Sequence, residues 1–149
     1  MKQEFVPYEQ AFALLDLGFD EPCVACFTFG NKKYIEILEE FTTSSQLGEQ
    51  MDRRLKNILE DDQDQYTLED YFDVQDESSF AAPTFSQAFR WFREKHALSS
   101  WVYNGYMDKY FYTILRNGRL VQANKSVTTY EEAELACLKK LIKLSTQTK

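Results

Sequence analysis

The sequence predicts an α+β protein in which helices pack on a largely antiparallel sheet. The chain has 149 residues, of which 44% are hydrophobic and 15% aromatic. A chain of this length and composition can bury a real core without disulfides or metals. Helical periodicity and strand alternation occupy separate stretches, and short turns that suit antiparallel neighbours join the strand stretches.

The first helix is expected to begin at Pro7 and to stop at Gly18. Proline is favoured at a helix start, and glycine readily takes the left-handed conformation that ends a helix. CVACFTF at 23–29 and KKYIEIL at 32–38 alternate as two strands of a hairpin. A further helix is expected over about residues 45–59, because its apolar residues recur at helical spacing.

The second half of the chain opens on a helix that Thr84 and Gln87 can cap reciprocally. The stretch 99–123 then alternates as a three-stranded meander. Asn117-Gly118 predicts a tight type I′ turn, since both residues tolerate positive φ.

Two positions are open for the earlier turn of the meander, Asn104-Gly105 and Met107-Asp108. An internal similarity between the two halves of the chain favours the second, because Gly30-Asn31 aligns with Met107-Asp108. A last helix follows Thr128 and Thr129, each of which has a glutamate at capping-box spacing.

The two halves of the chain share a short sequence similarity. QAF at 10–12 recurs as QAF at 87–89, an offset of 77 residues. At the same offset Lys32, Tyr34 and Ile37 align with Lys109, Phe111 and Ile114. Both a duplication and convergence on a common helix composition remain open. The predicted organisation is one domain, 1–149, with an α-β-β-α half (1–59), an acidic insert or linker (60–82) and an α-β-β-β-α half (83–149).

The negative charge is concentrated in the predicted insert. The formal net charge is −7, and residues 60–77 contain nine acidic residues and no lysine or arginine. Such a run is typical of a solvated surface. We expect it to be loosely ordered, apart from a short helical turn near TLEDYF.

Cys23 and Cys26 have the spacing of half a zinc site or of a redox pair. In a strand, however, side chains three residues apart point to opposite faces, and the pair does not begin a helix. The chain contains one further cysteine, Cys137, and one histidine, His96. Together with Cys23 and Cys26 these would make four ligands, so a zinc site remains an alternative. The strand context favours buried, reduced, metal-free thiols.

No enzyme motif is present. The sequence lacks a glycine-rich phosphate loop, a G-x-S-x-G elbow and an H-E-x-x-H zinc motif. We therefore assign no catalytic residue and no cofactor, and the chain is not expected to be an enzyme. It also lacks a signal-like apolar N-terminus and any run of about 18 apolar residues. The odd number of cysteines then favours the cytoplasm.

The order α-β-β-β-α over residues 84–144 is that of a double-stranded RNA-binding domain. Such a domain needs lysine or arginine at the start of its last helix to reach phosphates. Here Glu131, Glu132 and Glu134 occupy that start, and the sequence pI is about 4.8. Binding of nucleic acid is therefore not expected.

FVPYEQAFALLDLGFDEPC, APTFSQAFRWFREKH and TYEEAELACLKKLI resemble a group of small uncharacterised proteins of Bacteroidetes bacteria and their phages. The similar stretches cover about half of the chain. The resemblance implies a phage or prophage accessory protein in the host cytoplasm that binds and modulates another protein. It implies no catalytic or binding residue.

YFYTIL at 110–115 is apolar on both faces of its predicted strand, and helices can cover only one of them. We therefore expect an at least partly exposed aromatic patch that mediates self-association or partner capture, formed by Trp101, Tyr103, Tyr110 and Tyr112. The alternative is that both faces are core. The predicted function is a non-enzymatic interaction protein; a small enzyme or a nucleic-acid effector, including an acidic decoy, is the other possibility.

Overall fold

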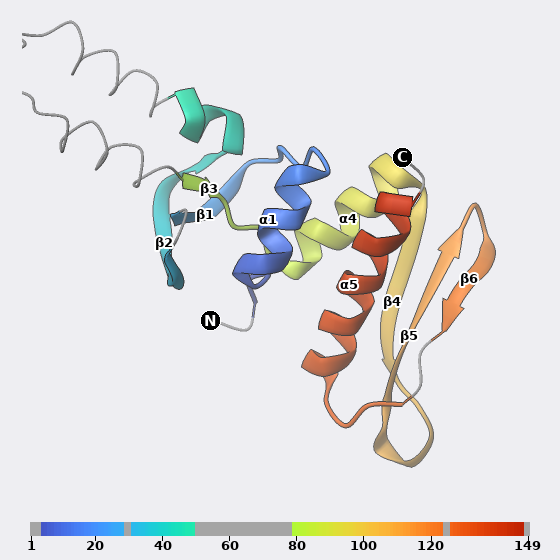
Figure 1. The fold of residues 1–149 in the computed structure, drawn as a ribbon. Helices are drawn as coiled ribbons and strands as arrows, with labels where there is room; N and C mark the ends of the chain where they lie inside the picture. The colour runs from blue at the N-terminus through green and yellow to red at the C-terminus, as the bar shows by residue number, and fades with distance from the viewer. Residues whose placement is uncertain (1–3, 29–30, 50–78, 124–125, 148–149) are drawn as a thin grey trace, which may run out of the picture. The chain divides into compact units, whose positions relative to one another are not determined.

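The computed structural model describes residues 4–28, 31–49, 79–123 and 126–147. Helices and two three-stranded antiparallel sheets make up this part of the chain, which confirms the α+β prediction (Figure 1). The chain divides into two compact units. We call Met1–Leu17 with Thr84–Lys149 the larger unit and Gly18–Pro83 the smaller unit.

The larger unit combines three helices with one sheet. The helices are α1 (Tyr8–Asp16), α4 (Phe85–His96) and α5 (Tyr130–Gln147), and the strands are β4 (Leu98–Asn104), β5 (Tyr110–Arg116) and β6 (Arg119–Ala123). The sheet order is β4-β5-β6. Helix α4 packs on β4, and α5 packs on both β4 and β5 (Figure 1). The order α4-β4-β5-β6-α5 is the one that the sequence predicts.

Local sequence signals set the ends of these helices. Pro7 is the N-cap residue of α1, and Gly18 follows its end with a φ of +99°. Thr84 and Gln87 form the predicted capping box, with Gln87 donating its backbone N–H to Thr84 Oγ1 at 3.2 Å. At the start of α5, Glu132 donates its backbone N–H to Thr129 Oγ1 at 3.1 Å.

Both turns of the meander lie where the sequence places them. Asn117 and Gly118 have φ values of 52° and 79°, which fit the type I′ turn. At the earlier turn Met107 and Asp108 are the residues with positive φ, at 59° and 56°. The Met107-Asp108 alternative is therefore confirmed, and a short 3₁₀ turn, η1 (Tyr106–Asp108), contains it.

The smaller unit contains a second sheet, with β1 (Cys23–Thr28) between β2 (Asn31–Thr42) and β3 (Ser79–Ala81). The predicted β1–β2 hairpin is confirmed. Strand β3 lies near the end of residues 60–82, the predicted acidic insert or linker: it pairs with β1, and the Phe80 ring lies 5.9 Å from that of Phe27. Phe80 is buried, and that burial offsets the cost of ordering so short a strand.

A helix begins in the smaller unit close to the predicted position. Residues 44–49 are helical. Asp20 accepts hydrogen bonds from the backbone N–H and the hydroxyl of Ser45, at 2.8 and 2.6 Å. The rest of the predicted helix and the acidic residues 60–77 lie outside the described residues.

The elements α1-β1-β2 and α4-β4-β5 follow one another in the same order, as the internal similarity predicts. Helix α1, however, belongs to the larger unit together with α4. The compact units therefore do not coincide with the sequential halves 1–59 and 83–149. Whether the halves arose by duplication stays a prediction.

None of the helices in the described residues has the length and apolar character needed to cross a membrane.

Candidate functional site

The register of β4 and β5 decides which side chains share a face of the sheet in the larger unit. Ser100 lies opposite Ile114, and Val102 lies opposite Tyr112. Ile114 and Tyr112 are 0% and 6% exposed, because α4 and α5 cover this face. Trp101 lies opposite Thr113 on the other face of the sheet.

We call this other face the open face. None of its side chains carries a charge, and they are Ser99, Trp101, Tyr103, Phe111, Thr113, Leu115, Leu120 and Ala123. Trp101, Tyr103 and Leu120 are 47%, 41% and 65% exposed. Among the elements described for the larger unit, no helix lies over this face (Figure 1). An apolar, partly aromatic patch is therefore available to a partner.

The structure separates the four residues of the predicted aromatic patch. Trp101 and Tyr103 lie on the open face, as expected. Tyr112 lies on the covered face and is buried, and its pKa is raised by burial and by the nearby Cys137. Tyr110 is also on the covered side, where its ring packs edge-on against Tyr130 at 6.0 Å. The four predicted residues therefore do not form one patch. Only Trp101 and Tyr103 lie on the open face.

Gly105 allows the aromatic residues of the open face to stack. The rings of Tyr103 and Phe111 lie 5.6 Å apart with an interplanar angle of 18°. A Cβ atom at position 105 would lie 2.5 Å from Cε2 of Phe111, closer than atoms can approach. Glycine therefore leaves space for the Phe111 ring, which in turn supports Tyr103.

The turn between β4 and β5 carries two more exposed apolar side chains. Tyr106 and Met107 are 82% and 73% exposed. A backbone hydrogen bond from Gly105 N–H to Lys109 O, at 2.8 Å, closes this turn. The turn is one end of the β4–β5 hairpin.

The three cysteines are buried and free, and Cys23 and Cys26 lie in β1 as predicted. Burial raises the pKa of Cys23 and of Cys137 to about 12, with smaller contributions from Glu21 and Glu134. Burial also raises the pKa of Cys26. Within the described ranges, no three His, Cys, Asp or Glu side chains converge as metal ligands would. Thiols with such raised pKa values suit a core rather than a reactive site.

We expect native protein at pH 8 to react with a thiol reagent at least about 100-fold more slowly than free cysteine, because so little thiolate forms. After unfolding in guanidinium chloride, all three cysteines should react. Absorbance of the released chromophore measures both rates. Rapid reaction of one thiol in the native protein would show that the burial argument is wrong.

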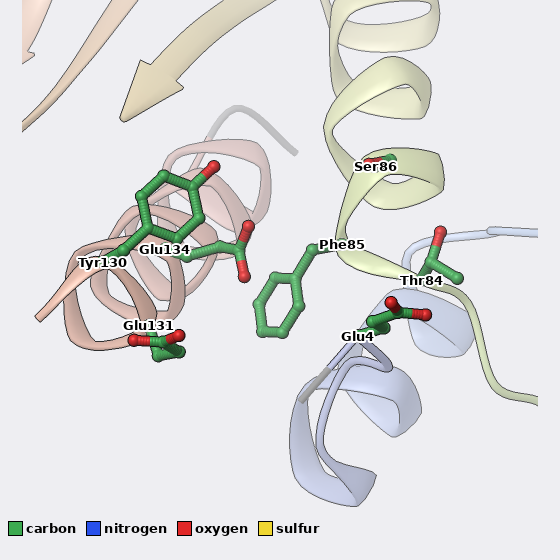
Figure 2. A pocket seen from close by; sticks show the side chains of 7 residues that line it. All are labelled: Glu4, Thr84, Phe85, Ser86, Tyr130, Glu131 and Glu134. Atoms are coloured by element: carbon green, nitrogen blue, oxygen red, sulfur yellow. The ribbon is translucent and has the colours of Figure 1, made fainter. Parts of the chain in front are cut away.

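A pocket of about 490 Å³ lies elsewhere in the larger unit, away from the open face. It is lined by Glu4, Thr84, Phe85, Ser86, Tyr130, Glu131 and Glu134. Figure 2 shows the Phe85 ring projecting from the start of α4 between Glu134 on one side and Glu4 on the other. The sequence pattern singles out three of these residues, Thr84 as a helix cap and Glu131 and Glu134 as an obstacle to phosphate binding, and none of them as part of a pocket.

The pocket shifts the pKa of one of its carboxylates, Glu134. Its pKa is raised by burial and by the neighbouring Glu131, while a hydrogen bond from the Tyr130 hydroxyl partly offsets the rise. The pKa of Tyr130 is raised as well, first by burial and then by Glu134. A negative charge at Glu134 is therefore held in the pocket at a cost to folding.

Glu134→Gln is expected to raise the thermal midpoint at pH 7. Because the pKa of Glu134 is higher in the folded state than in the unfolded one, this group stabilises the fold when protonated and loses that contribution as the pH rises. The gain from the variant should shrink as the pH falls below the ordinary pKa of glutamate. Differential scanning calorimetry of the wild type and the variant at pH 4 and pH 7 measures this difference in thermal midpoint.

Glu132→Gln provides a matched control on the same turn of α5. Glu132 accepts a hydrogen bond from the Thr128 hydroxyl at 3.0 Å and stands in the first turn of the helix, where a negative charge is favourable. This variant should lower the midpoint slightly. A lower midpoint for both variants would contradict the argument for Glu134.

Comparison with known proteins does not assign the chain to a family: no family model, no curated protein and no solved structure matches it.

Proposed function

We propose that this chain is a non-enzymatic interaction protein that associates with a second copy of itself through the open face. One observation carries the proposal: aromatic residues on adjacent strands form an exposed, uncharged face that no described helix of the larger unit covers. Tyrosine and tryptophan are enriched at interfaces, because they bury a large rigid area with little loss of side-chain entropy.

The absence of charge on the open face supports a second copy as the occupant. The larger unit contains twelve lysines and arginines against eight acidic residues, so two copies of this unit that meet through charged side chains would bring like charges together. Two open faces can meet without burying any charged side chain of their own strands. A two-fold arrangement would place Trp101 and Tyr103 of one copy against the open face of the other.

Sedimentation equilibrium over a concentration series tests this proposal. The apparent mass should rise from 17.6 kDa toward twice that value as the concentration increases. The double variant Trp101→Ser, Tyr103→Ser should weaken the association at least about tenfold, since loss of two central aromatics removes more than about 1.4 kcal/mol. Phe12→Ser is the control, because Phe12 is also an exposed aromatic residue, at 45%, but lies on α1.

Salt dependence distinguishes a second copy from a charged partner. Added salt should not weaken self-association, because the open face carries no charged side chain, whereas it should weaken binding of a charged partner. Wild-type protein that stays at the monomer mass up to about 1 mM would overturn the proposal. So would a double variant that associates as strongly as the Phe12→Ser control.

A further inference from the structure

We propose that the pocket between α4 and α5 binds an organic cation, specifically a primary ammonium group on an aliphatic chain. The lining contains three carboxylates and no lysine, arginine or histidine. It also contains two aromatic rings, Phe85 and Tyr130. Carboxylates favour the ammonium head, while the rings provide an apolar surface for the stem and an attractive face for the charge.

The main chain fixes the residues on the α4 side of the pocket. Phe85 donates its backbone N–H to the carbonyl of Glu4 at 3.0 Å, and Phe5 forms a β-bridge with Thr84. The capping box of Thr84 and Gln87 holds the first turn of α4. Phe85 is 8% exposed, so its ring forms part of the pocket wall rather than a free surface.

The first turns of α5 supply the other carboxylates. Glu131 and Glu134 are three residues apart and therefore lie on one side of the helix, and both line the pocket. Figure 2 shows the Glu134 side chain extending toward Phe85. Glu132, between these two glutamates, is held by the Thr128 hydroxyl and does not line the pocket. Glu132 therefore stabilises the N-terminus of α5, and Glu131 and Glu134 line the pocket.

The size and geometry of the pocket favour an organic cation over a metal ion. Its volume of about 490 Å³ is that of a small-molecule or side-chain site rather than of a single ion. Calcium and magnesium need several oxygen ligands at about 2.0–2.6 Å. Of the residues described, no three acidic, cysteine or histidine side chains converge in that way, and this includes the three glutamates of the pocket.

The energetics of Glu134 agree with a cationic ligand. Burial and Glu131 both disfavour the charged form of Glu134. An ammonium group placed between the two carboxylates would remove their repulsion and satisfy the carboxylate oxygens that Tyr130 leaves free. The ligand would therefore offset the unfavourable interactions of the Glu134 carboxylate.

Calorimetric titration with two probes tests the proposal and identifies the source of the ammonium group. The first probe is Nα-acetyl-lysine N-methylamide, whose free side-chain ammonium group represents a lysine of a protein. The second is 1,4-diaminobutane, which represents a free diamine. N-acetyl-norleucine methylamide is the neutral control. We expect saturable binding of at least one amine and none of the norleucine compound; the tighter probe indicates whether the site serves a peptide or a free amine.

Variants separate the pocket from the general negative charge of the chain. Glu134→Gln should weaken amine binding at least about tenfold, and Glu132→Gln should change it less than about twofold. Both remove one charge from the same helix turn, and Glu134→Gln is expected to fold at least as stably as the wild type. Equal weakening by both variants, equal binding of the norleucine compound, or no saturable binding up to about 20 mM would overturn the proposal. None of these results depends on association through the open face.

Discussion

Replacement of Phe92 by alanine is expected to lower the free energy of unfolding of the larger unit by about 3–5 kcal/mol. Phe92 is 0% exposed, and its ring contacts Trp91 edge-on at 5.1 Å and His96 at 5.6 Å. Alanine would leave a cavity between α4 and its neighbours. Such a loss is a large part of the stability of an ordinary domain, which is about 5–15 kcal/mol.

Urea unfolding followed by tryptophan fluorescence measures this effect in the relevant unit. Both tryptophans of the chain, Trp91 and Trp101, belong to the larger unit. Phe12→Ala is the control: it makes the same change at a side chain that is 45% exposed, and it should cost about 1 kcal/mol or less. Equal losses for the two variants would show that α4 does not hold the core as described.

Tyr112→Ala is expected to destabilise the larger unit by about 3 kcal/mol, whereas Tyr103→Ala should cost about 1 kcal/mol or less. The two tyrosines lie on adjacent strands but on opposite faces of the sheet. Tyr112 is 6% exposed under the helices, and Tyr103 is 41% exposed and stacks only on Phe111 among the aromatic contacts of the described chain.

Tyr112→Phe refines this comparison, because it keeps the ring and removes the hydroxyl. It should retain most of the stability that Tyr112→Ala loses, since the buried ring provides the packing. The same urea titration measures all three variants. If Tyr103→Ala proves as costly as Tyr112→Ala, the open face is part of a core, and the proposed interaction surface is wrong.

Much of the fold can be predicted from local sequence signals. The capping box of Thr84 and Gln87, the Asn117-Gly118 turn and the stop at Gly18 each depend on residues a few positions apart. These helix ends and this turn can therefore be predicted without knowledge of the tertiary structure. The β1–β2 hairpin and the order of elements from α4 to α5 follow from the same kind of signal.

The features that the sequence did not predict depend on distant contacts. Strand β3 has only three residues and becomes recognisable through its pairing with β1. YFYTIL is apolar on both faces, so only the packing of the helices decides that Tyr112 is buried while Phe111, on the opposite face, is half-buried. The pocket joins Glu4 to residues near position 130, a distance along the chain that no local pattern spans.

The two tryptophans allow a direct test of association through the open face. Trp91 is 5% exposed on α4, and Trp101 is 47% exposed on the open face. Each side chain gives its own indole N–H signal in a ¹⁵N-correlated NMR spectrum. Across a dilution series, we predict that the Trp101 signal shifts or broadens with increasing concentration while the Trp91 signal stays in place. A Trp101 signal that does not change over a range in which the sedimentation mass rises would contradict the proposal.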